Sequence, residues 1–118
     1  MAERAVGVAF VGAGSISEMH GRGVSSCRQA QYIGVFDPDP SRAKAHAAKF
    51  GGKAYGRFEQ ILEDPQVEAV HVLSPQECHV SQALASLKAG KHVLVEKPVA
   101  HEISQIEILV EAAADAGR

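Results

Sequence analysis

The sequence predicts a single α/β domain of Rossmann-like architecture, built on a doubly wound, mostly parallel sheet of five strands. Apolar runs of strand length alternate with segments of helical periodicity along all 118 residues, which is typical of βαβ units. Right-handed crossovers then place helices on both faces of the sheet. Hydrophobic residues make up 46% of the chain but aromatic residues only 5%, so the core must be mainly aliphatic. The length fits one domain.

Each expected strand is a short apolar run that ends in a turn signal. The first run is followed by Gly12, and the second by the segment Asp37-Pro38-Asp39-Pro40. The third run is the weakest, because it is short and only partly apolar. The predicted strand order in the sheet is 3-2-1-4-5. In chain order the strands are Val6–Val11, Gln31–Phe36, Lys53–Tyr55, Ala69–Leu73 and His92–Glu96.

The expected helices carry apolar residues at intervals of three and four positions. The second helix has the clearest boundaries: Asp39 can cap it, Pro40 suits its first turn, and Gly51 can end it. The last helix has an apolar stripe (Ile103, Ile106, Leu109, Val110, Ala113) that we expect to face inward. The helices are Ser15–Cys27, 40–50, Phe58–Glu63, His79–Ala89 and Ile103–Ala116.

Composition excludes several classes of protein. The formal net charge of −2 argues against a broadly basic nucleic-acid binder. No apolar run approaches the ~18 residues of a membrane span. Cys27 and Cys78 lack the paired spacing of a disulfide framework or a metal site. We therefore expect reduced thiols, a cytoplasmic protein, no bound metal, and neither nucleic acid nor membrane as a partner.

The loop after the first strand has the composition of a phosphate-binding turn. Gly12 permits a tight turn, and Gly14 has no Cβ, so the backbone can approach a diphosphate closely. The following helix supplies free N–H groups and the positive end of its dipole. Ser17 replaces the third glycine of the usual G-x-G-x-x-G pattern and is small enough for close packing. The candidate phosphate-binding residues are Gly12, Gly14, Ser15 and Ile16.

Asp37 follows the second strand, roughly 20 residues after the glycine loop, where dinucleotide-binding folds place a ribose-binding acid. A carboxylate here accepts hydrogen bonds from ribose hydroxyls and repels a 2′-phosphate, which favours NAD over NADP. The alternative is that Asp37 only opens the Asp-Pro-Asp-Pro turn. Arg42, one helical turn further, could pair with a phosphate, so NADP stays possible.

Later segments of the sequence contain more specific motifs. The run from Gly90 to Pro98 (Gly-Lys-His-Val-Leu-Val-Glu-Lys-Pro) resembles the G-K-H-V-x-x-E-K-P segment of the Gfo/Idh/MocA family of NAD(P)-dependent oxidoreductases. The glycine loop followed by His20 is similar to that family's loop with its downstream histidine. Ser74 and the residues after it resemble its Thr-Pro-Asn-x-x-His loop, with serine for threonine and glutamine for asparagine. The resemblance covers nearly the whole chain.

The resemblance implies roles for particular residues. Lys97 would be the catalytic residue, placed beside the nicotinamide, its ribose and the substrate hydroxyl, with Lys97–Pro98 a candidate cis peptide bond. His20 would either pack or contact the cofactor, whereas His71, inside a strand, has the pattern of a buried, hydrogen-bonded group. The remaining residues implied to line the cofactor cleft are Ser74, Pro75, Gln76, His79, Glu96 and Pro98.

The last helix is followed by no further strand, where a doubly wound sheet would continue. We therefore expect a truncated chain that lacks the family's second α/β domain and leaves the fifth strand with a bare edge, through which copies could associate. The expected function is the NAD(P)-binding domain of an oxidoreductase acting on a small-molecule sugar, polyol or related alcohol. The alternatives are a non-catalytic dinucleotide sensor or regulatory module, and a purely structural domain.

Overall fold

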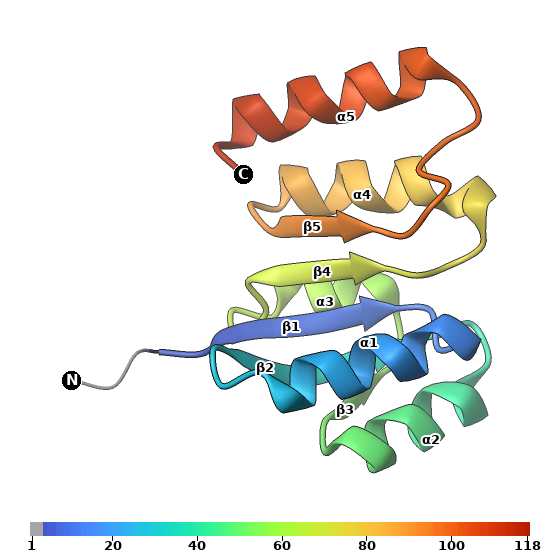
Figure 1. Ribbon diagram of the computed structural model, residues 1–118, viewed down its shortest axis with the longest axis vertical. Coiled ribbons are helices and arrows are strands. Elements are labelled where there is room, and N and C mark those ends of the chain that lie inside the picture. Colours follow the sequence, from blue (N-terminus) through green and yellow to red (C-terminus); the bar gives the residue numbers. More distant parts are fainter. Residues whose placement is uncertain (1–3) are drawn as a thin grey trace.

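The computed structural model describes residues 4–118 and shows a five-stranded, all-parallel sheet in the order β3-β2-β1-β4-β5 (Figure 1). This confirms the predicted fold class and strand order. The strands are β1 (Val6–Val11), β2 (Ala30–Phe36), β3 (Lys53–Tyr55), β4 (Ala69–Val72) and β5 (His92–Val95). The helices are α1 (Ser15–Ser26), α2 (Pro40–Phe50), α3 (Phe58–Glu63), the 3-10 turn η1 (Gln76–Cys78), α4 (His79–Lys88) and α5 (Ile103–Ala116).

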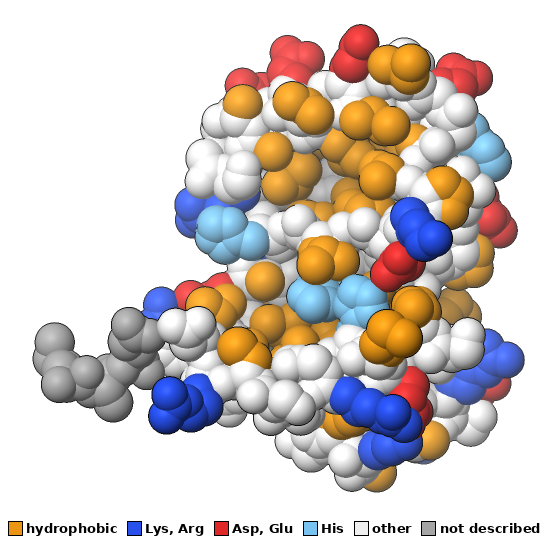
Figure 2. Space-filling model, in the orientation of Figure 1, with side chains coloured by type: hydrophobic (Ala, Val, Ile, Leu, Met, Phe, Trp, Pro, Cys, Tyr) orange, Lys and Arg blue, Asp and Glu red, His pale blue; other side chains and the backbone are white. Residues whose placement is uncertain are grey.

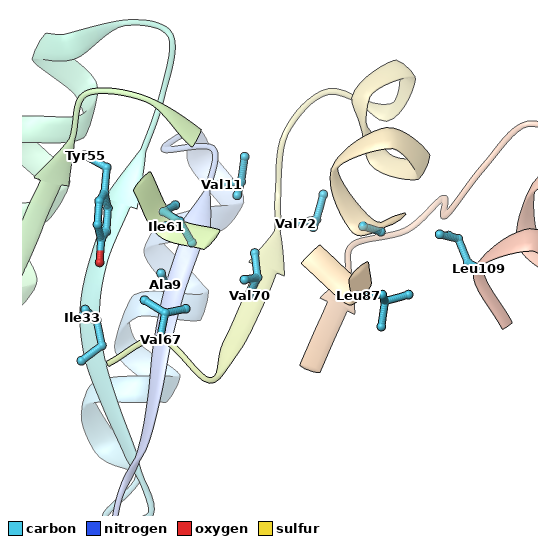
Figure 3. Close-up of a cluster of buried hydrophobic side chains, with 11 residues drawn as sticks. Ala9, Val11, Ile33, Tyr55, Ile61, Val67, Val70, Val72, Leu87 and Leu109 are labelled. Carbon is cyan, nitrogen blue, oxygen red and sulfur yellow. The ribbon is translucent and has the colours of Figure 1, made fainter. Parts of the chain in front are cut away.

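Two hydrophobic clusters, one on each face of the sheet, form the core. Successive side chains of β1 point to opposite faces, so Phe10 packs with α1 and α2, whereas Ala9 and Val11 pack with α3, α4 and α5. Figure 3 shows the second cluster, which includes Ile61 from α3 and Leu87 from α4. The aliphatic core expected from the composition is present.

The boundaries differ from the predicted ones by one residue at a few ends. The predicted last residue of β4, Leu73, lies outside the strand, although its N–H still donates to the carbonyl of Val11 at 2.8 Å. The prediction for α2 is confirmed in detail. Asp39 caps it by accepting from the N–H of Ser41 at 3.0 Å, and Gly51 ends it in the left-handed conformation.

The prediction for the apolar stripe of α5 is wrong in part. Leu109 is buried, but Ile103 is 75% exposed and Val110 is 65% exposed. Figure 1 shows α5 beyond β5, at the rim of the sheet. Of the residues in α5, only Leu109 is buried. None of the helices in residues 4–118 is long and apolar enough to cross a membrane.

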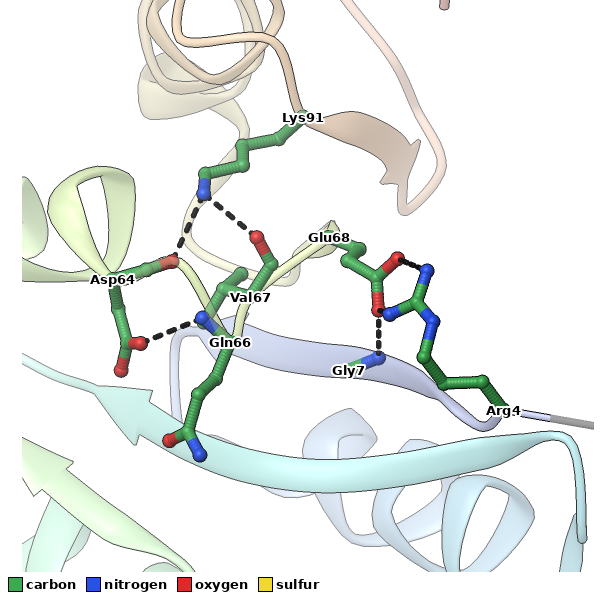
Figure 4. Close-up of polar contacts among 7 residues, drawn as sticks. All are labelled: Arg4, Gly7, Asp64, Gln66, Val67, Glu68 and Lys91. Atoms are coloured by element: carbon green, nitrogen blue, oxygen red, sulfur yellow. Dashed lines mark hydrogen bonds and ion pairs between the residues drawn. The ribbon is translucent and has the colours of Figure 1, made fainter.

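A buried lysine holds the loop that leads into β4. The Nζ of Lys91 donates to the carbonyls of Asp64 (3.0 Å) and Val67 (2.7 Å), and Figure 4 shows it reaching across this loop. Nearby, Glu68 accepts from the Arg4 guanidinium and from the N–H of Gly7. The amino ends of β1, β4 and β5 are therefore joined by charged groups, at the edge opposite the candidate site.

We expect Lys91→Met to lower the free energy of unfolding by about 2 kcal/mol, because two buried carbonyls lose a charged donor. Urea unfolding followed by circular dichroism measures the change. Lys88→Met is the matched control, since Lys88 is exposed at the end of α4. Equal losses in the two variants would contradict this role for Lys91.

Candidate dinucleotide-binding site

The predicted site residues gather at one edge of the sheet. Because all five strands are parallel, their carboxyl ends lie on the same side (Figure 1), which is where open α/β sheets bind ligands. The glycine loop follows β1, Asp37 follows β2, Ser74 follows β4 and Glu96 follows β5. Four loops that are far apart in sequence therefore face a common region.

The turn out of β1 requires glycine at its first position. Gly12 has φ of +105°, a conformation that side-chain-bearing residues rarely adopt, and a Cβ there would lie 2.8 Å from the backbone of Leu73 and Ser74. The N–H of Gly12 donates to the carbonyl of Phe36 at 2.8 Å. The loop is thereby fixed against the ends of both neighbouring strands.

Gly14, unlike Gly12, has open space where a side chain would be. It is the exposed N-cap residue of α1, and a Cβ added to it would meet no atom within 4 Å. The first residues of α1, Ser15 and Ile16, follow directly, so this end of the helix faces the open space. Ser17 is buried at the position of the missing third glycine, where its hydroxyl donates to the Gly14 carbonyl.

Asp37 is bound to the glycine loop itself. Its Oδ2 accepts from the N–H of Ala13 at 2.8 Å, and its Oδ1 accepts from the N–H of Asp39 at 2.9 Å. The second bond is the turn-forming bond of the simpler interpretation of this residue. The first bond could not be foreseen from spacing, and it holds the carboxylate beside the loop with further lone pairs to spare.

Arg42 lies further out, in the first turn of α2. Its guanidinium approaches the carboxylate of Asp39 at 3.8 Å, and both side chains are largely exposed. Together with Gly14 and Lys49 it lines a cavity of about 210 Å³ between α1 and α2. Lys49 also contacts Glu18 across this cavity. Two basic side chains, each paired with an acidic one, therefore lie beside the glycine loop.

The segment after β5 forms an exposed turn with a cis peptide bond between Lys97 and Pro98, as the family resemblance implies. One oxygen of Glu96 accepts from the N–H of Lys97 at 3.2 Å, and the other contacts Nε2 of His20 at 2.9 Å. The hydrogen bond from His20, followed by that from the Lys97 N–H, holds the pKa of Glu96 below its usual value. Glu96 is therefore a carboxylate at neutral pH.

His79 lies behind the loops rather than in the open space between them. It is 2% exposed, and its ring nitrogens contact the carbonyls of Ser74 (2.7 Å) and Pro98 (2.9 Å). The hydroxyl of Ser74 contacts the side-chain amide of Gln82, and Gln76 approaches His101 at 3.5 Å. His79 thus joins the loop after β4, which includes Pro75, to the loop after β5.

His71 has the hydrogen-bonded role predicted for it. Its Nδ1 lies 3.0 Å from Nδ1 of His20, and its ring stacks on Phe10. Burial, with a smaller contribution from the charge of His20, lowers the pKa of His71 to about 4. His71 is therefore neutral at physiological pH.

This depressed pKa predicts a loss of stability in acid. The unfolded chain binds a proton at His71 as the pH falls below its ordinary pKa of 6.5, whereas the folded chain does so only near 4. The stabilisation is thus complete above 6.5 and is lost between 6.5 and about 4. We expect the free energy of unfolding, measured in urea, to fall less steeply over this range in His71→Gln than in the wild type. Parallel pH profiles would contradict the assignment.

The fold and the glycine loop joined to an acid define a dinucleotide-binding Rossmann domain. Residues 6–118 match the model of an oxidoreductase family with an NAD-binding Rossmann fold, Gfo/Idh/MocA. The chain belongs to this family.

Individual relatives support the assignment to this family. The chain is 37% identical to the inositol 2-dehydrogenase of Acidothermus cellulolyticus over 118 residues, covering 98% of this chain and 35% of that protein. A solved structure of GenD2 from gentamicin A biosynthesis, in complex with NAD, matches with a TM-score of 0.94 and 31% identity, covering 99% of this chain and 33% of that one. A 3-ketoreductase from Actinomadura kijaniata, in complex with NADP and TDP-benzene, matches with a TM-score of 0.93 and 28% identity, covering 97% of this chain and 35% of that one.

The two solved structures contain NAD and NADP, respectively. The chain spans about a third of the length of the curated relatives it matches.

Proposed function

We propose that this chain is the NAD(P)-binding domain of an oxidoreductase that transfers a hydride between a nicotinamide cofactor and a sugar, polyol or related alcohol. The observation that carries the proposal is the position of Asp37 beside the open backbone at Gly14. Gly14 leaves open backbone at a helix N-terminus, and Asp37 is held beside it through the Ala13 N–H. This combination fits a diphosphate next to a ribose.

The residues divide along the cofactor. The amides of the Gly12–Ile16 loop would hold the diphosphate, and Asp37 would accept from the adenosine ribose hydroxyls. The loops that carry Ser74, Pro75, Gln76 and Glu96 would flank the nicotinamide half, and His79 would support both from behind. The observed contacts support this division, because the loops after β1 and β2 are joined to each other, as are those after β4 and β5.

Lys97 is the proposed catalytic residue. Its side chain is exposed at the carboxyl edge, in a turn fixed by Glu96 and Pro98. A bound nicotinamide supplies or accepts the hydride. The Lys97 ammonium would stabilise negative charge that develops on the substrate oxygen and hold the proton exchanged there.

We propose NAD as the preferred cofactor. The Asp37 carboxylate would repel a 2′-phosphate close to the ribose. One observation favours NADP instead: Arg42 and Lys49 line the cavity beside Gly14. Asp39 already pairs with Arg42, and Glu18 with Lys49. Both cations would therefore attract a 2′-phosphate less strongly, which supports NAD.

Calorimetric titration of the chain with NAD, NADP and ADP tests the binding function. We expect micromolar-to-millimolar affinity for NAD and ADP, with NADP weaker than NAD. Absence of binding at millimolar NAD would overturn the proposal. Hydride transfer is tested by nicotinamide absorbance in the full-length gene product with a panel of sugars and polyols. Binding without turnover would favour the non-catalytic dinucleotide sensor.

The edge of β5 supports a further proposal, that copies of the chain associate in the cytoplasm. Within residues 4–118, β5 pairs only with β4, and Leu94 is 44% exposed on it. Figure 2 shows hydrophobic side chains gathered on the part of this face where Figure 1 places β5 and α5. A second copy could pair along this edge. We expect sedimentation velocity to show association that rises with concentration, and a monomer at all concentrations would contradict it.

A further inference from the structure

Three side chains from separate elements form a continuous polar chain across the sheet. His71 of β4 contacts His20 of α1, with 3.0 Å between their Nδ1 atoms, and Nε2 of His20 contacts Oε2 of Glu96 at 2.9 Å. Figure 2 shows histidine side chains near the middle of this face of the molecule. These contacts connect β4 and α1 to the turn after β5, although α1 is not adjacent to that turn in sequence.

His20 is held firmly enough to orient Glu96. Its side chain is only 15% exposed, and its ring packs edge-on against Phe10, with 6.1 Å between centroids. Phe10 also stacks on His71 at 5.1 Å. Both rings therefore pack against the fully buried Phe10, which fixes the direction in which Nε2 of His20 points.

Glu96, held by His20, in turn restrains the backbone of Lys97. With Oε2 engaged by His20, the carboxylate presents Oε1 to the N–H of Lys97. On the other side of the turn, the Pro98 carbonyl is bound by His79. The backbone of Lys97 is thereby held from α1 on one side and from α4 on the other, while its side chain stays exposed.

We propose that His20 is a positioning residue for Lys97, acting through Glu96 to set the turn that faces the nicotinamide half of the cofactor. This inference rests on the proposed function, which places Lys97 at that half. His20 would therefore affect only the nicotinamide end of the cofactor. At the adenosine end, the glycine loop and Asp37 are held by hydrogen bonds that do not involve His20. Removing His20 should disturb the nicotinamide end and leave the adenosine end intact.

The test compares two ligands and two substitutions by calorimetry. His20→Leu should lower NAD affinity about threefold through loss of the hydrogen bond to Glu96, with the ADP affinity unchanged. His20→Gln, which keeps a donor, should restore most of the NAD affinity. His92→Leu is the control, since His92 is exposed at the start of β5. Equal losses for NAD and ADP, or no loss for either, would overturn the proposal.

A second measurement does not depend on any cofactor. Amide hydrogen exchange followed by NMR should show the Lys97 N–H exchanging about tenfold faster in His20→Leu, while the N–H of Ala9 in the core strand β1 is unchanged. An unchanged Lys97 amide would overturn the positioning role even if the wild type bound NAD. Failure of the wild type to bind NAD would instead overturn the proposed function.

Discussion

Asp37→Ala is expected to weaken NAD binding by about 2 kcal/mol, or roughly thirtyfold, in calorimetric titration. The substitution removes the acceptor proposed for the ribose hydroxyls, whose hydrogen bonds to a carboxylate are stronger than neutral ones. It also frees the N–H of Ala13, which Asp37 holds at 2.8 Å, so the phosphate loop loses its anchor. Both effects act on the adenosine half of the cofactor.

The ligand comparison makes this prediction specific. Asp37→Ala should weaken ADP as much as NAD, whereas Lys97→Ala should weaken NAD slightly and ADP not at all. Asp39→Ala is the matched control: it loses the cap of α2 but lies outside the proposed ribose contact. If Asp37→Ala and Lys97→Ala had equal effects on NAD, the division of roles along the cofactor would be wrong.

Most of the fold could be predicted because its signals are local. Alternating apolar runs and helical spacing predicted every strand and α-helix to within one residue at each end, and Asp39 and Gly51 marked the ends of α2. The stripe of α5 misled because periodicity shows which residues are apolar, not what packs against them. Val110 has the right spacing, but no part of the described chain covers it.

The sequence predicted which loops would meet at the candidate site, but not the contacts between them. Sequence motifs picked out Gly14, Asp37 and Lys97, and the parallel topology brings their loops to one edge. The bond from the Ala13 N–H to Asp37 joins positions 24 residues apart. The bond between His20 and Glu96 joins positions 76 apart. Such pairs have no periodic signal, since they depend on the register of strands that are adjacent only after folding.

The structure distinguishes exposed residues at the carboxyl edge of the sheet from buried residues that join its loops. His79 illustrates this, because the family motif implies a place in the cleft, while the folded chain uses both its ring nitrogens to join two loops. Substitutions at His79 should consequently disturb the backbone at Ser74 and Pro98 first. The open positions, Gly14 and Lys97, are where substitutions can alter binding without altering the fold.

Gly14→Asp provides the sharpest such separation. Gly14 is the N-cap of α1 without a side-chain cap, so aspartate there should keep or raise the melting temperature, both by capping the helix and by complementing its dipole. The added carboxylate would occupy the space proposed for the diphosphate. At an effective dielectric constant of about 20 and a separation of about 5 Å, each phosphate charge would be repelled by about 3 kcal/mol. We therefore expect NAD affinity to fall by roughly a hundredfold or more.

Two further variants identify the cause. Gly14→Asn caps the helix equally well and adds the same volume without the charge, so it should lose part of the affinity that Gly14→Asp loses. Gly12→Ala should instead lower the melting temperature, because its Cβ would meet the backbone of Leu73 and Ser74 at 2.8 Å in a left-handed conformation. If Gly14→Asp bound NAD as well as the wild type, the diphosphate could not lie against the N-terminus of α1.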